Sequence, residues 1–254
     1  MMPVRRFSPT VPRPLRCVGA MLTIVLLQAC TSAGVGRHQA IAPVMPLSDA
    51  PPTRATLIDI AQNEWRFFGE QQIDMRQPVL SAPRLGLLED EGAAVQRIAL
   101  YWRAVGRPWT GADCGQAWSA AFISYLMVAA NVPPDQFAPS DVHFTYLSFL
   151  RQRETQPAPA FVLRPAATAP IAPGDLLCAP RGDNAASTLD DIRPGLPGHC
   201  DLVVDVHPQQ GWAAVIGGNV YNSVSESLIP VDARGVAMPI AVRPWLVVAK
   251  NLLP

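Results

Sequence analysis

The most constraining feature of the sequence is an almost entirely apolar segment at residues 117–130. It contains neither glycine nor proline and is longer than an ordinary strand, so it predicts a buried central helix. Apolar residues at helical spacing predict two further helices before it, at residues 56–69 and 91–105. Ser140 and Asp141 can cap a fourth helix that runs to about residue 153.

The pattern changes after residue 174. Short apolar or β-branched runs, separated by glycine, proline and asparagine, predict a small antiparallel sheet. These runs cover residues 175–179, 200–206, 212–216 and 246–250. Helices followed by strands indicate an α+β fold.

The N-terminus resembles the signal peptide of a bacterial lipoprotein. Four arginines in the first sixteen residues precede an apolar run at residues 17–29, which is short for a membrane span. Leu27-Gln28-Ala29-Cys30 resembles a lipobox, so we expect cleavage after residue 29 and a lipid on Cys30. An ordinary secretory signal or a short membrane anchor is the alternative. Thr31 is not the aspartate that retains lipoproteins in the inner membrane, which implies an outer-membrane location facing the periplasm.

Residues 30–55 are rich in alanine, proline and serine and predict a flexible tether. Residues 56–254 contain no internal repeat and no second long linker, so we expect one domain there. The net charge is zero, and no lysine or arginine cluster follows the first sixteen residues. These features argue against nucleic acid as a partner.

Three stretches carry the candidate chemistry: Trp118-Ser119-Ala120-Ala121-Phe122-Ile123, Pro173-Gly174-Asp175-Leu176, and Gly198-His199-Cys200-Asp201 with the later Gly217-Gly218-Asn219. Together they resemble the papain-like NlpC and CHAP cell-wall peptidases, with Ser119 in place of the nucleophilic cysteine. Over about residues 90–230 the chain looks most like the bacterial domain-of-unknown-function family 2272. The resemblance implies a papain-like fold with Ser119 as nucleophile, His199 as base and Asn219 as the residue that orients His199.

The expected substrate is an amide in peptidoglycan peptides. A side chain in the first turn of a buried helix faces unpaired backbone N–H groups, which stabilise a developing oxyanion. A serine hydroxyl ionises far less readily than a thiol, so two outcomes stay open: a serine amidase, or a module that binds wall peptide without cutting it. A third interpretation is a structural envelope lipoprotein whose partners are proteins.

Cys114 is the alternative nucleophile, because Asp113-Cys114-Gly115 resembles the Asp-Cys-Ser start of the NlpC motif. Five residues before Ser119, it would face away even if helical. Cys178 and Cys200 lie in neighbouring predicted strands, and we expect a disulfide between them, with two buried thiols as the alternative.

Three further residues are candidates for lining the cleft. They are His143, Trp118 and Asp201. A histidine near a helix start is often structural, and Trp118 is expected in the core rather than as a sugar-stacking platform. The sequence shows neither the spacing of a zinc site nor a phosphate-binding loop, so we predict no cofactor.

Overall fold

The structure is a computed structural model that describes residues 43–77, 85–182, 186 and 188–254. The expected signal peptide, Cys30 and the first part of the tether lie outside these ranges. Within the described ranges, no helix is long and apolar enough to cross a membrane.

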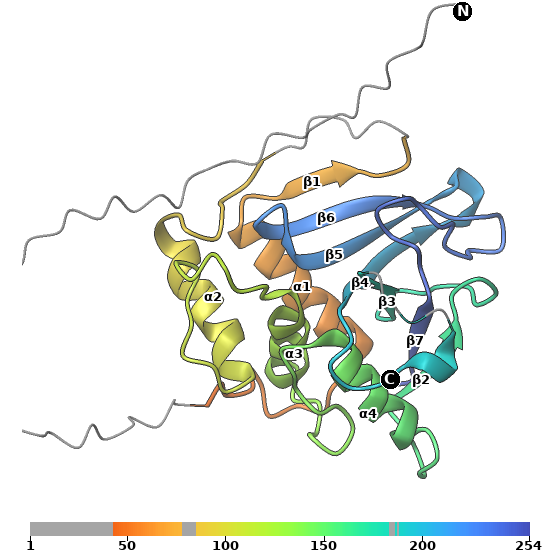
Figure 1. Cartoon of the computed structure of the whole chain (residues 1–254), viewed down its shortest axis with the longest axis horizontal. Helices are drawn as coiled ribbons and strands as arrows, with labels where there is room; N and C mark the ends of the chain where they lie inside the picture. Colours follow the sequence, from red (N-terminus) through yellow and green to blue (C-terminus); the bar gives the residue numbers. More distant parts are fainter. Residues whose placement is uncertain (1–42, 78–84, 183–185, 187) are drawn as a thin grey trace, which may run out of the picture. The chain divides into compact units, whose positions relative to one another are not determined.

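Among the residues that the structure describes, four α-helices occupy the first half of the domain (Figure 1). They are α1 (Arg54–Phe67), α2 (Gly92–Ala104), α3 (Ser119–Ala129) and α4 (His143–Arg153). α1 begins after Thr53, whose Oγ1 accepts a hydrogen bond from the backbone N–H of Thr56 at 3.0 Å. α3 ends just before Asn131, which adopts a left-handed φ of 59°. The four predicted helices are therefore confirmed, with small shifts at their ends.

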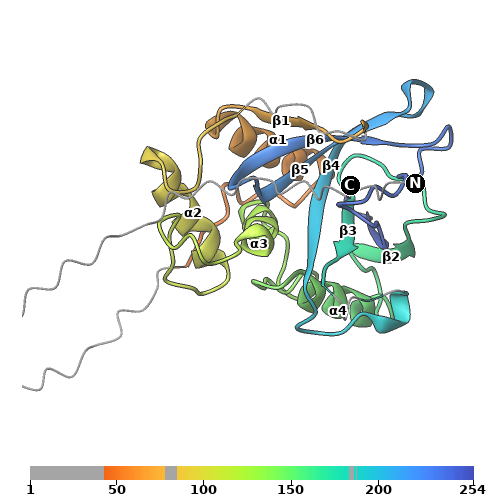
Figure 2. The ribbon, with the colours of Figure 1, turned by 45° about the horizontal axis from the view of Figure 1, so that its top comes forward.

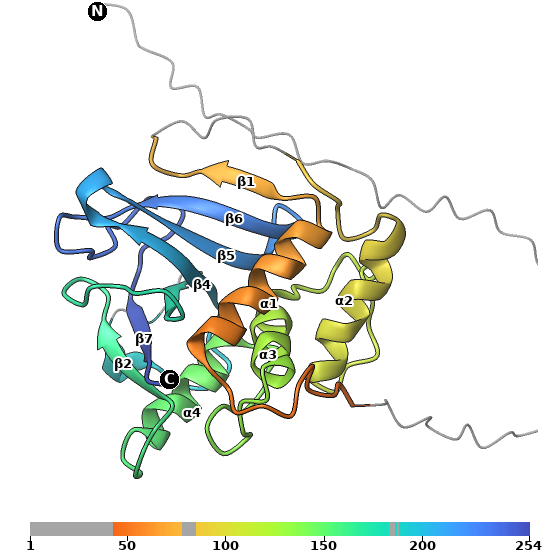
Figure 3. The same cartoon turned by 180° about the vertical axis from the view of Figure 1, so that it is seen from behind.

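α3 is the central helix, as its composition predicts. Every residue of α3 except Val128 is buried. The helix lies between α1 and α2 (Figure 3) and packs against β4 and β5 of the sheet. A helix apolar on all sides needs this cover on all sides. α4 packs against β2 and β4 (Figure 2).

In the described part of the chain, the sheet has seven strands in the order β1-β6-β5-β4-β3-β7-β2. The strands are β1 (Gln71–Asp74), β2 (Phe161–Pro165), β3 (Leu176–Pro180), β4 (Gly198–His207), β5 (Trp212–Val220), β6 (Ser223–Pro230) and β7 (Val247–Asn251). Neighbouring strands are antiparallel except β1 and β6, which are parallel. The sequence analysis predicted a small antiparallel sheet, and the structure corrects this prediction. The α+β class is confirmed, but the sheet is larger and mixed.

Both faces of the sheet are buried, because successive strand residues point to opposite sides. On β4, Leu202 belongs to the core shared with the helices, whereas Val203 belongs to a second cluster on the other face. On β5, Ile216 and Val215 divide in the same way. Trp245, in the segment before β7, covers the second cluster.

Strands β1, β2 and β6 are missing from the sequence prediction. β6 is hard to recognise because Ser223 and Ser225 occupy fully buried positions. Their polarity is satisfied locally: the hydroxyl of Ser225 donates to the carbonyl oxygen of Val220 at 2.8 Å, and Nε2 of Gln71 donates to Oγ of Ser225 at 2.7 Å. Buried polar residues that hydrogen-bond to one another look like loop residues in a hydrophobicity pattern, so the pattern does not identify this strand.

The last part of the expected tether contacts the domain. The backbone N–H of Leu47 donates to the carbonyl oxygen of Ala129 at 2.9 Å, and Nδ2 of Asn131 donates to the carbonyl oxygen of Ala50 at 3.3 Å. Residues 43–53 therefore lie against the C-terminal end of α3.

The structure joins Cys178 of β3 and Cys200 of β4 in a disulfide. The two residues are direct partners in the β3–β4 register, with 4.1 Å between their Cα atoms. The bond ties β3 to the strand that carries His199.

Candidate functional site

Ser119 is the first residue of α3 and keeps 6% of its surface exposed. The first backbone N–H groups of a helix have no helical acceptor, so this end of α3 favours negative charge. The Oγ of Ser119 lies 2.7 Å from Nε2 of His143. The predicted nucleophile therefore contacts an imidazole, but it is His143 and not the expected His199.

His143 is the first residue of α4 and is held by the next turn of that helix. Its Nδ1 lies 2.6 Å from the hydroxyl of Tyr146, three residues later. Burial, and then the neighbouring His199, lower the pKa of His143 well below its usual value, so the ring is neutral at pH 7. Burial raises the pKa of Tyr146, which keeps its proton. A neutral imidazole can accept a proton from Ser119 when Nδ1 carries the ring hydrogen.

Asp201 contacts His199 from two residues further along β4, on the same side of the strand. Nε2 of His199 and Oδ1 of Asp201 are 2.7 Å apart, and both residues are buried. Burial alone would raise the pKa of Asp201, but the interactions with His199 and Arg243 outweigh it and lower that pKa to about 2. An ionised carboxylate only accepts hydrogen bonds, so Nε2 of His199 donates.

The second nitrogen of His199 is left without a partner. Burial lowers the pKa of His199, so the ring is neutral at pH 7 and Nδ1 carries a lone pair. Nδ1 is buried and makes no hydrogen bond within the described part of the chain. The rings of His199 and His143 are 5.4 Å apart between centroids. Ser119, His143, His199 and Asp201 thus form one buried polar cluster.

Glycines keep space for this cluster. A Cβ atom on Gly217 of β5 would lie 1.9 Å from Oδ1 of Asp201 and 3.1 Å from Nε2 of His199. A Cβ atom on Gly198 would lie 2.2 Å from the ring of Phe144 on α4. A larger residue at Gly217 would collide with the cluster, and one at Gly198 would collide with Phe144, the neighbour of His143.

Arg243 supplies positive charge behind the carboxylate. Its Nε lies 3.6 Å from Oδ2 of Asp201, and its side chain is 9% exposed. Arg181, which follows β3, is exposed at the rim of the same region. Arg243 interacts electrostatically with both Asp201 and His199, and Arg181 interacts with His199.

Asn219 does not orient His199, which corrects the sequence analysis. Asp201 occupies the place at Nε2 of His199 instead. The β5–β6 register shifts between Gly217 and Val220, and Asn219 adopts a left-handed φ of 56° in that irregular segment. Its side chain lines a small pocket with Arg181 and Arg243.

Trp118 lies in the core of the domain. It is 1% exposed, its Nε1 donates to Oε2 of Glu89 at 2.7 Å, and its ring stacks on that of Phe68. Cys114 lies in a turn before α3, and its Sγ is 3.8 Å from the carbonyl oxygen of Gly111. Ser119 is therefore the nucleophile candidate that the structure places against an imidazole.

Tyr146 and the two arginines were missed by the sequence reasoning. A tyrosine three residues after His143 is one helical turn away, and that spacing could have identified it. Nothing local in the sequence marks Arg181 or Arg243.

No group of three or more histidine, cysteine, aspartate or glutamate residues within the described ranges could hold a metal ion.

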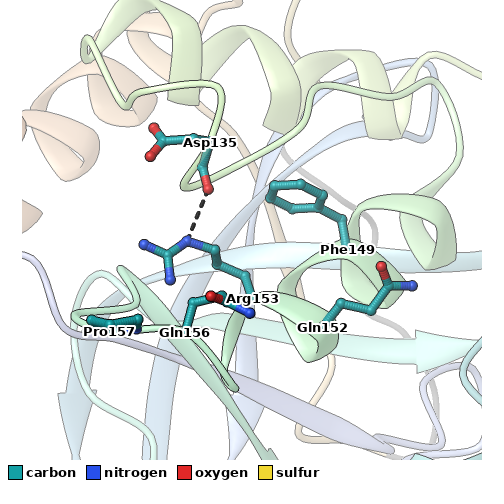
Figure 4. Close-up of a pocket in the computed structure, with 6 residues that line it drawn as sticks. All are labelled: Asp135, Phe149, Gln152, Arg153, Gln156 and Pro157. Atoms are coloured by element: carbon teal, nitrogen blue, oxygen red, sulfur yellow. Dashed lines mark hydrogen bonds between the residues drawn. The ribbon is translucent and has the colours of Figure 1, made fainter.

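A separate pocket of about 570 Å³ lies at the C-terminal end of α4 (Figure 4). Arg153 lines it and donates from Nε to the carbonyl oxygen of Asp135 at 3.0 Å. His143 is at the opposite end of α4, about 15 Å away at 1.5 Å per residue. This pocket is therefore distinct from the polar cluster.

The two buried imidazoles predict acid sensitivity. Both have a pKa below 6.5 in the folded protein, chiefly through burial, so the unfolded chain binds more protons below pH 6.5. Their contribution to stability is complete above pH 6.5 and declines below it, by up to ~1.4 kcal/mol per pH unit for each group. Urea unfolding between pH 8 and 5.5 should show this fall, and His199→Gln should reduce its slope. A wild-type stability that is flat from pH 7 to 5.5 would contradict the neutral buried pair.

These features define an α+β domain with a buried serine, histidine and aspartate cluster. The sequence profile of the bacterial family described as "Uncharacterized protein conserved in bacteria (DUF2272)" matches residues 89–248, and the chain belongs to this family. The match includes Ser119, His143, His199, Asp201 and Arg243. Searches of curated proteins and of solved structures found no match.

Proposed function

We propose that this chain is a serine-dependent amide hydrolase with a papain-like arrangement, which acts on peptidoglycan peptides from a lipid-anchored position in the cell envelope. The observation that carries the proposal is the 2.7 Å contact between Oγ of Ser119 and Nε2 of His143 at the start of a buried helix. A nucleophile and a base within hydrogen-bond reach are the first requirement of covalent acyl transfer.

The reaction follows from that contact. Oγ of Ser119 attacks the carbonyl carbon of the amide while its proton moves to Nε2 of His143. Backbone N–H groups at the start of α3 stabilise the oxyanion. When the C–N bond breaks, His143 returns the proton to the leaving amine. Water then attacks the acyl ester, gives a proton to His143, and releases the carboxylic acid as Ser119 regains its hydrogen.

Asp201 assists by charge. The imidazolium that forms on His143 is disfavoured by burial and by His199, but the carboxylate of Asp201 raises the pKa of His143 and opposes them. His199 lies between the two and fixes Asp201 through its Nε2–H. The roles thus differ from the sequence expectation, with His143 as base and the His199–Asp201 pair as its electrostatic support.

The papain-like part of the proposal rests on the order of elements. Ser119 begins a buried helix, and His199 and Asp201 follow on β4 of the sheet packed against that helix. The proposed base, His143, instead begins α4. The wall-peptide substrate rests on the resemblance of the motifs to NlpC and CHAP peptidases. The anchor and the periplasmic location rest on the lipobox at Cys30.

A binding module without turnover is the second candidate. The near-complete burial of Ser119 and His143, at 6% and 3% exposure, favours it, because substrate must reach Oγ for catalysis. This alternative predicts peptide affinity that survives Ser119→Ala.

The proposal is tested with a fluorophosphonate probe on the full-length chain, in which Oγ of Ser119 attacks phosphorus and displaces fluoride to form a phosphonate ester. We expect labelling of Ser119, mapped by mass spectrometry, that is lost in Ser119→Ala and strongly slowed in His143→Gln. Cys114→Ala should label like wild type, since Cys114 lies outside α3. Absence of labelling on folded wild-type protein would overturn the hydrolase and favour the binding module.

A further inference from the structure

A small pocket of about 220 Å³ adjoins the His199–Asp201 pair. Arg181, Asn219 and Arg243 form its polar side, and Met75, Val220 and Val242 are among its apolar residues. Arg243 connects the pocket to the cluster, because its Nε is 3.6 Å from Oδ2 of Asp201.

The pocket carries an excess of positive charge. Arg181 and Arg243 both line the pocket, and the carboxylate of Asp201 interacts electrostatically with both of them. Arg243 is 8% exposed, and its Nε makes no hydrogen bond within the part of the chain that is described. The charge of Arg243 pairs with Asp201, but a buried N–H donor without an acceptor is costly, and a planar carboxylate or similar anion matches the guanidinium fork.

The surroundings add an apolar requirement. A second pocket of about 370 Å³ shares Met75 and Val242 with the first and is also lined by Met238 and Ile240. Met238 and Val242 are about half exposed, so they present apolar surface to this second pocket. A ligand that places an anion between the arginines can therefore lay an apolar group along these residues.

We infer that the Arg181–Arg243 pocket binds the terminal carboxylate of a peptide whose preceding residue is small and apolar. The peptide nature of the ligand rests on the proposed function, since the pocket lies beside the same cluster. The carboxylate preference rests on the two arginines alone.

The test is calorimetric titration of the full-length Ser119→Ala chain with N-acetyl-D-alanyl-D-alanine and with its C-terminal amide. We expect the acid to bind about tenfold or more tightly than the amide, because a charge-assisted hydrogen bond contributes about that ratio. Arg181→Gln should reduce the ratio to about threefold or less, and Arg243→Lys should also reduce it while keeping a charge beside Asp201. Arg234→Gln removes an exposed arginine paired with Asp232 and should keep the full ratio.

Equal affinity for acid and amide would overturn the inference, as would a preference that Arg181→Gln and Arg243→Lys both leave intact. Because Ser119→Ala binds without cleavage, the result is independent of turnover. A retained acid preference with no fluorophosphonate labelling would overturn the hydrolase but support the pocket. Fluorophosphonate labelling without any acid preference would support the hydrolase but overturn the pocket.

Discussion

Asp201→Asn is expected to slow the labelling of Ser119 by a fluorophosphonate probe by roughly 10- to 100-fold, because Asp201 acts on the base His143 through its charge and not through a hydrogen bond. The amide oxygen can still accept from Nε2 of His199, but the negative charge that favours an imidazolium on His143 is gone. Asp201→Ala should also lower the free energy of unfolding by about 3–5 kcal/mol, because it leaves Arg243 buried without its carboxylate. Labelling rates and urea unfolding measure the two effects.

The chain supplies a matched control on the same strand. Asp205 lies 2.8 Å from Nε2 of His207, two residues later, but this pair is partly exposed. Asp205→Asn should therefore change neither the rate of probe labelling nor the stability appreciably. A wild-type rate of labelling in Asp201→Asn would show that the buried pair has no part in the reaction.

Glu64→Ala is expected to destabilise the domain by about 3–5 kcal/mol without altering the polar cluster directly. Glu64 of α1 is 1% exposed. Its carboxylate accepts a hydrogen bond from Nε of Arg97 of α2 at 2.7 Å. It also accepts from the hydroxyl of Tyr101 at 2.6 Å and from that of Tyr125 at 3.3 Å. The carboxylate therefore joins α1, α2 and α3. Its removal leaves a guanidinium and two hydroxyls without their acceptor, and urea unfolding should report the loss.

A surface ion pair provides the comparison for Glu64. Asp190 is 88% exposed on its side chain and pairs with Arg151 at 2.5 Å. Asp190→Ala should cost less than ~1 kcal/mol, since exposed pairs contribute little. Equal losses in Glu64→Ala and Asp190→Ala would contradict the view that α1 is held through Glu64.

The helices and four of the strands could be predicted because their apolar residues repeat with the period of the element. The apolar run of α3 is the clearest example, since no other arrangement buries it. β1 and β6 could not be found in this way, because Gln71, Ser223 and Ser225 are buried polar residues that satisfy one another or the backbone. Their pattern reflects hydrogen bonding and not hydrophobicity.

The candidate site was predictable only in part. Motif spacing placed Ser119 at the start of α3 and His199 on β4, where the structure has them. The contact between Ser119 and His143 depends on how α4 is positioned relative to α3, which no local pattern records. Asp201, and not the predicted Asn219, contacts His199. This difference depends on the irregular end of β5, where the register shifts after Gly217.

The most direct test of the central claim is digestion of purified peptidoglycan by the full-length chain, with products identified by mass. Wild type, Ser119→Ala, Cys114→Ala and Ser119→Cys would be compared. We predict new amino termini with wild type and Cys114→Ala and none with Ser119→Ala. If only Ser119→Cys released products, the cleft would be one that binds substrate but has lost turnover. If neither wild type nor any variant released products, a wall hydrolase would be contradicted.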